Sequence, residues 1–155
     1  MEAVVEFHGF KDNENRFVIK ELAVVSDLFQ WQLVFAPPYS KCRLNSKMQR
    51  TARWLTRHFH RIDWDDGVIP YNEHLIRTLC KTFPVIYTKG LEKATFLKQF
   101  HPDVREIDCT TSCNDNGCDI GCVLPQHSDV NSKCALRNAL LYKSSLDLKN
   151  SVSTS

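Results

Sequence analysis

Thiol and imidazole side chains cluster towards the C-terminal end of the chain, over residues 118–138. Cys122 and His127 fall in an expected loop, and Cys134 falls on the first turn of an expected helix. Zinc in proteins takes four tetrahedral ligands, mostly thiolate and imidazole, and carboxylate oxygen is an accepted ligand as well. The spacing therefore predicts one structural zinc ion with three ligands from this segment and a fourth from elsewhere in the fold.

The same loop offers a second arrangement of thiols. Cys109, Cys113, Cys118 and Cys122 would form a site of four thiolates. Their even spacing lacks the two close pairs and the long arm that are typical of zinc ribbons and fingers. The remaining alternative is that the loop cysteines bind no metal and that Cys134 packs as a small hydrophobic residue. We favour the mixed site because Cys134 would be held by a helix.

The composition is that of a folded chain in a reducing compartment. The chain has 155 residues, of which 43% are hydrophobic and 25% charged, enough for one domain with its own core. We expect this domain over residues 1–148 and a flexible tail over 149–155. The sequence shows neither a signal peptide nor an apolar stretch as long as a membrane span. Seven cysteines without a secretion signal favour an intracellular protein, cytoplasmic or nuclear.

Positive charge is concentrated in one segment. Residues 41–61 contain seven Lys and Arg and no acidic residue, whereas the rest of the chain has 13 Lys and Arg against 18 Asp and Glu. Apolar residues at three- and four-residue spacing predict a helix from about Leu44 to Phe59. Basic residues and one tryptophan recur on a neighbouring face: Arg43, Lys47, Arg50, Arg53, Trp54, Arg57 and Arg61. This face is either a solvated surface or a phosphate-binding row with an aromatic side chain for base stacking.

The rest of the chain alternates expected strands and helices. Strands are predicted over residues 3–7, 17–25, 29–35, 84–87 and 104–108, the first three as an antiparallel meander. Besides the basic helix, helices are predicted over residues 71–81, 90–100 and 131–148. The order predicts an α/β fold whose mixed sheet has three antiparallel strands and two short parallel ones, flanked by helices.

This order resembles the ribonuclease-H-like fold of the DEDD-type 3′–5′ exonucleases. Those enzymes carry Asp-x-Glu on the first strand, an aspartate on a middle helix and His-x4-Asp on the last helix. The matching places hold Glu6-Phe-His8, then Lys93, then Lys133 and Asn138. Two-metal hydrolysis needs several carboxylates around two cations. The resemblance therefore implies a degenerate exonuclease fold without conventional exonuclease activity.

The chain is also similar to the Maelstrom domain, a fold of this class that lacks the carboxylate set and holds one zinc ion through Glu, Cys, His and Cys. A strand around Glu21, a second strand running into Pro-Pro, and a Cys-Ala-Leu-Arg-Asn helix start carry the similarity, which extends to a largely insect group of uncharacterised proteins. It implies Glu21, Cys122, His127 and Cys134 as zinc ligands, although Glu21 could also face water. Because the family's Cys-to-His spacing is tighter than here, Cys118 competes with Cys122.

These features together predict a non-catalytic adaptor module or a module that binds nucleic acid, single-stranded RNA in the first place, through the basic helix. A structural zinc ion would tie the last helix to the sheet. The Maelstrom resemblance implies an alternative, a single-strand RNA endonuclease that does not use the exonuclease carboxylates. A third hypothesis is a protein-interaction module derived from a mobile element or virus. No membrane partner is expected in any of the three.

Overall fold

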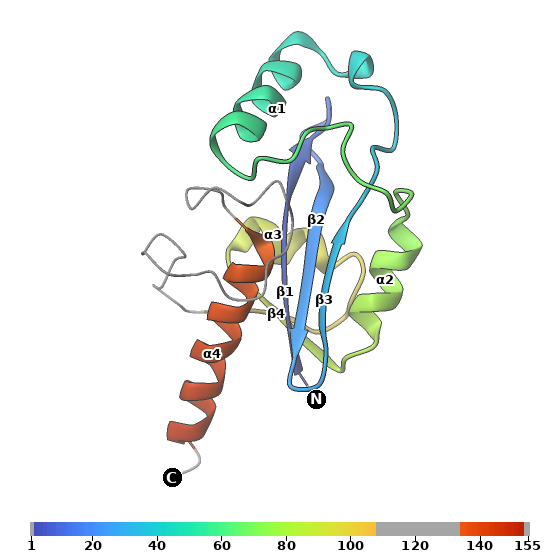
Figure 1. Ribbon diagram of the computed structural model, residues 1–155. Helices are drawn as coiled ribbons and strands as arrows, with labels where there is room; N and C mark the ends of the chain where they lie inside the picture. Colours follow the sequence, from blue (N-terminus) through green and yellow to red (C-terminus); the bar gives the residue numbers. More distant parts are fainter. Residues whose placement is uncertain (1, 108–133, 154–155) are drawn as a thin grey trace.

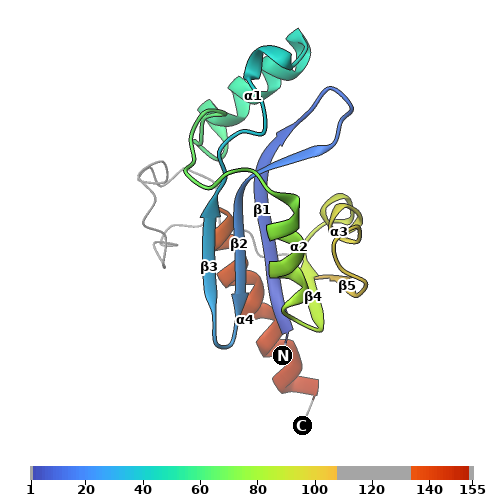
Figure 2. The same cartoon turned by 90° about the vertical axis from the view of Figure 1, so that its right-hand side faces the viewer.

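A computed structural model of the chain describes residues 2–107 and 134–153. In these residues five strands form one sheet with helices on both faces (Figure 1, Figure 2). In chain order the elements are β1 (Glu2–Lys11), β2 (Phe17–Ser26), β3 (Gln30–Val34), the 3-10 turn η1 (Lys41–Arg43), α1 (Ser46–His58), α2 (Glu73–Lys81), β4 (Val85–Thr88), α3 (Leu91–Leu97), β5 (Val104–Glu106) and α4 (Ala135–Ser153).

The sheet has the strand order β3-β2-β1-β4-β5. β1, β2 and β3 pair antiparallel, β4 pairs parallel with the start of β1, and β5 pairs parallel with β4. The predicted mixed sheet of three antiparallel and two short parallel strands is therefore confirmed. Parallel pairing of β1 with β4 requires a long connection, and this connection contains the basic helix α1.

The first strand is longer than predicted. β1 runs to Lys11 instead of ending at Phe7, because a bulge between His8 and Gly9 lets the strand bend and continue its pairing with β2. A Cβ atom on Gly9 would lie 2.1 Å from the carbonyl oxygen of Val18, so only glycine fits this approach of the two backbones. The prediction that Gly9 closes the strand is wrong because the glycine lies inside a bulge.

Alternation along β1 gives the sheet two different buried faces. Ala3, Val5 and Phe7 belong to the larger apolar core, which also contains residues of α2 and α3. Glu6 and His8 alternate with them and point to the opposite face, where the first turns of α4 pack. α1 lies over the far end of the β1–β2 hairpin (Figure 1).

Several helix boundaries differ from the prediction: α1 is shorter than residues 44–59, and α3 ends at Leu97, three residues before Phe100. α2 does not begin at the residue after Pro70, because Asn72 caps it: the Asn72 side-chain oxygen accepts hydrogen bonds from two backbone N–H groups of the first turn, at 2.9 and 3.4 Å. α4 continues to Ser153, five residues beyond Leu148. Among the helices of the described residues, none has the length and apolar character needed to cross a membrane.

Candidate metal centre and nucleic-acid interface

Glu21 and Cys134 meet where α4 begins, although 113 positions separate them in the chain. The exposed fraction of Glu21 is 0% and that of Cys134 is 1%, so the alternative that Glu21 faces water is wrong. The Glu21 Oε2 atom lies 3.7 Å from Cys134 Sγ, and the backbone N–H of Ala135 donates to Glu21 Oε1 at 2.9 Å. A carboxylate at this position compensates the positive end of the α4 dipole.

The spacing of these two donor atoms fits a tetrahedral zinc ion. Two ligands at zinc–sulfur and zinc–oxygen distances of about 2.3 and 2.1 Å stand about 3.6 Å apart at a tetrahedral angle. The side chain of Gln32 on β3 donates to Glu21 Oε2 at 2.7 Å and lies 3.8 Å from Cys134 Sγ. A hydrogen-bond donor that contacts a metal ligand fixes the orientation of that ligand, as is common around protein metal sites. The donor set present here is therefore compatible with zinc.

The other predicted ligands lie outside the described residues. These are Cys122, His127 and the competitor Cys118, together with Cys109 and Cys113 of the alternative four-thiol site. Within residues 2–107 and 134–153, no group of three or more His, Cys, Asp and Glu side chains is placed to hold a metal ion. The structure thus brings together the two predicted ligands that are farthest apart in the sequence.

Glu6, His8 and Glu21 are buried polar residues on one face of the sheet, and we call this group the polar strip. His8 is the register partner of Glu21 across the β1–β2 pair, and its Nδ1 atom lies 3.8 Å from Glu21 Oε1. Glu6 is 2% exposed and accepts a hydrogen bond from the Nζ atom of Lys93 at 2.5 Å. Burial raises the pKa of Glu6, and Lys93 acts in the opposite direction. The expected proximity of Glu6 and Lys93 is observed, whereas Lys133 lies outside the described residues.

Five of the six predicted basic residues of the α1 segment face solvent, and Arg61 does not. A cap formed by Asn45, whose side chain accepts from the backbone N–H of Met48 at 2.8 Å, starts the helix. Ala52 is its fully buried residue. Arg61, beyond the end of α1, is half-buried with a φ of 63°. The exposed cations are Arg43, Lys47, Arg50, Arg53 and Arg57. Within the part of the chain that the structure describes, no carboxylate forms an ion pair with any of these five.

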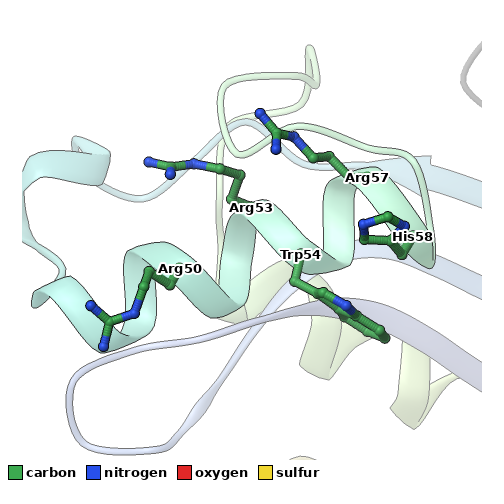
Figure 3. Close-up of a pocket in the computed structure, with 5 residues that line it drawn as sticks. All are labelled: Arg50, Arg53, Trp54, Arg57 and His58. Atoms are coloured by element: carbon green, nitrogen blue, oxygen red, sulfur yellow. The ribbon is translucent and has the colours of Figure 1, made fainter.

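Trp54 adds an aromatic surface to the same helix. Its exposed fraction is 55%, and its ring centroid lies 5.6 Å from that of His58. Together with three arginines these two residues line a shallow hollow of about 160 Å³: Arg50, Arg53, Trp54, Arg57 and His58. Figure 3 shows Arg53 and Arg57 extending above the helix, the ring of Trp54 lying below it and the ring of His58 beside its last turn. Guanidinium groups bind phosphate oxygens in a bidentate manner, and an exposed indole stacks on bases.

Sequence reasoning missed the polar strip as a unit. Glu6, His8 and Glu21 were each considered, but their position on one face was not recognised. The alternation of Glu6 and His8 on a strand is a local indication, since residues two apart share a face. Nothing in the sequence indicates that Gln32 donates a hydrogen bond to Glu21, because this contact depends on the pairing of β2 with β3.

Comparison of the chain with protein-family models, with curated proteins and with solved structures finds no match in any of the three. The similarity to the exonuclease fold and to the Maelstrom domain therefore remains a prediction. Function is accordingly inferred from the geometry of α1 and of the Glu21–Cys134 contact.

Proposed function

We propose that this chain is a non-catalytic module that binds single-stranded nucleic acid, RNA in the first place, through α1. The observation that carries the proposal is the row of Arg50, Arg53 and Arg57 beside an exposed Trp54 on one helix. An electropositive row supplies sequence-independent affinity for phosphates, and an exposed ring adds stacking on bases. Binding of this kind is salt-dependent and weakly sequence-specific.

The surroundings of Glu6 support a non-catalytic module. Two-metal phosphodiester hydrolysis needs several carboxylates that share two cations. The Glu6 carboxylate is instead bonded to the ammonium group of Lys93 and to the backbone N–H of Phe7. A carboxylate already neutralised by a lysine offers little negative charge to a divalent cation.

The test is charge reversal on α1. In a fluorescence anisotropy assay with labelled octauridylate, we expect Arg50→Glu with Arg57→Glu to weaken binding at least ~100-fold. Each phosphate bound on a single strand contributes about 0.7 to the slope of log K against log salt. The slope should therefore fall by roughly 1.4 when two arginines no longer bind phosphate. The matched control reverses two exposed lysines elsewhere, Lys81→Glu with Lys98→Glu, which alters the net charge equally.

Unchanged affinity in the α1 variant, or an equal loss in the control, would contradict the proposal. Cleavage of the octauridylate by the purified protein, abolished by the α1 variant, would favour the endonuclease alternative instead. Circular dichroism of both variants checks that they fold.

We further propose one structural zinc ion held by Glu21, Cys122, His127 and Cys134. The 3.7 Å contact between Glu21 Oε2 and Cys134 Sγ supports it. Metal analysis of the purified protein should find one zinc ion per chain, lost on Cys134→Ser and retained on Cys42→Ser, an exposed cysteine in η1. Absence of zinc from the unmodified protein, or retention of zinc by the Cys134→Ser variant, would contradict the site.

A further inference from the structure

His58, the last residue of α1, lies beside the indole of Trp54. The two ring centroids are 5.6 Å apart and the ring planes are tilted by 44°, and both side chains are exposed. Residues four apart on a helix are neighbours, so Trp54 lies between Arg50, one turn before it, and His58, one turn after it (Figure 3). The imidazole is therefore part of the surface on which the proposed strand lies.

The spacing along α1 places His58 at a phosphate. A helix rises about 1.5 Å per residue, so Arg50 and His58 stand about 6 Å before and after Trp54 along the axis. A strand that runs along α1 with one base on the indole has a phosphate on each side of that base. Arg50 then faces the phosphate on one side, and Arg57 and His58 face the phosphate on the other.

The charge of an imidazole changes in the physiological pH range, whereas the charge of a guanidinium group does not. Histidine side chains gain a proton near pH 6.5. Once protonated, the ring is a cation with two N–H donors, and a phosphate oxygen accepts from either. Within residues 2–107 and 134–153 the His58 ring has no hydrogen-bond or ion-pair partner, so its nitrogen atoms are available to a phosphate.

The other charged groups at this end of α1 are mostly cations. The titratable and charged side chains contributed by α1, by the residues after it and by the neighbouring elements are Arg53, Arg57, His60, Arg61, His8, Lys11 and Lys93. Both lysines form ion pairs with glutamates, and the ring of His60 is bonded to backbone groups. The carboxylates of Asp63 and Asp66 accept hydrogen bonds within their own turn. A proton on His58 therefore adds to the positive charge of the basic row.

We propose that His58 is a further phosphate-binding residue of α1 and that its protonation strengthens the binding of a single strand. The inference rests on the proposed function and adds a proton-dependent regulation to it. A phosphate binds the charged ring better than the neutral ring, so by linkage the formation of the complex takes up protons. The affinity should therefore rise as the pH falls through the range in which histidine gains its proton.

The test measures the affinity for labelled octauridylate by fluorescence anisotropy at about pH 8 and about pH 5.5. Uracil rings and phosphodiester groups neither gain nor lose protons over this range, so a change in affinity comes from the protein. One additional exposed ion pair predicts about fivefold tighter binding at the lower pH. The slope of log K against log salt should also be steeper there by about 0.7, the contribution of one phosphate of a single strand.

Three variants separate His58 from the other histidines. His58→Gln should bind equally well at both pH values. His58→Arg carries a permanent charge, so at about pH 8 it should bind as tightly as the unmodified protein does at about pH 5.5. The matched control is His74→Gln, which removes an exposed histidine of α2 and should keep the pH dependence. Calorimetric titration in two buffers of different ionisation enthalpy should show proton uptake by the unmodified protein and none by His58→Gln.

Equal affinity of the unmodified protein at the two pH values would overturn the inference. A pH dependence that persists in His58→Gln, or that disappears in His74→Gln, would overturn it as well. In each of these cases, binding that is weakened by Arg50→Glu with Arg57→Glu would leave the proposed function standing. If the unmodified protein does not bind octauridylate at either pH, the proposed function and this inference fail together.

Discussion

Glu21 is the position at which a single substitution should have the largest structural effect. Its carboxylate is fully buried between β2 and the first turn of α4, and it accepts hydrogen bonds from Ala135 N and Gln32 Nε2 at 2.9 and 2.7 Å. Glu21→Ala leaves both donors without this acceptor. A buried donor that loses its partner costs roughly 1–3 kcal/mol, and the vacated volume adds a cavity term.

The expected loss in the free energy of unfolding is therefore about 3–5 kcal/mol for Glu21→Ala. This is a large part of the roughly 5–15 kcal/mol that stabilises a typical domain. Glu21→Gln keeps the shape and one acceptor oxygen, so it should cost less, about 1–2 kcal/mol. The comparison of the two variants separates the loss of hydrogen bonds and volume from the loss of charge.

Urea unfolding followed by circular dichroism measures these differences. The control is Glu106→Ala, which removes an exposed carboxylate on β5 and should alter stability by no more than about 0.5 kcal/mol. A loss below about 1 kcal/mol in the Glu21→Ala variant, less than one buried donor costs, would refute the inference that this carboxylate holds α4 on the sheet.

Repeating the measurement with a chelator separates the metal from the hydrogen bonds. A ligand that binds only the folded state stabilises it by mass action. If zinc is bound through Glu21, the chelator should lower the urea concentration at which half of the unmodified protein is unfolded. The same midpoint of the Glu21→Ala variant should not change. An equal shift in both proteins, or none in either, would contradict zinc ligation by this residue.

Two further predictions concern β1 and β2. Lys20 is 1% exposed, and its Nζ atom donates to the backbone carbonyls of Trp64 and Asp66; burial lowers its pKa to about 8. In the unfolded chain Lys20 keeps its proton up to about pH 10.4. The free energy of unfolding, measured relative to that of the Lys20→Met variant, should therefore rise between about pH 8 and 10.4, by at most about 3 kcal/mol. A difference between the two proteins that stays constant with pH would refute this. Gly9→Ala should lower the free energy of unfolding in urea by about 3 kcal/mol, because the new Cβ atom would meet the Val18 carbonyl oxygen. Gly90→Ala should lower it by about 1 kcal/mol, because a Cβ atom there has no neighbour within 4 Å and only the φ of 100° is unfavourable. Equal losses in the two variants would refute the steric argument.

The sequence by itself determined the elements that depend on local periodicity. The three- and four-residue spacing over residues 44–59 predicted α1 and placed its cations and Trp54 on the exposed side, as observed. Strand patterns predicted the order of the elements along the chain and the antiparallel pairing of the first three strands, which is observed, but not the order of the strands in the sheet. These properties depend only on the directions of side chains within one or two turns of a helix or a few residues of a strand. Such directions are fixed by the local sequence pattern.

Local periodicity could not decide which of these residues meet: their proximity was expected only from the resemblance to a known fold, and the tertiary structure decides it. The contact of Glu21 with Cys134 and the pairing of Glu6 with Lys93 join residues 113 and 87 positions apart. The first depends on the register of β2 and the crossing of α4, and the second on the approach of α3 to β1. A one-residue shift in register would turn Glu21 to the opposite face of the sheet. The extension of β1 past Gly9 has the same origin, since the bulge exists only because β2 is paired beside it.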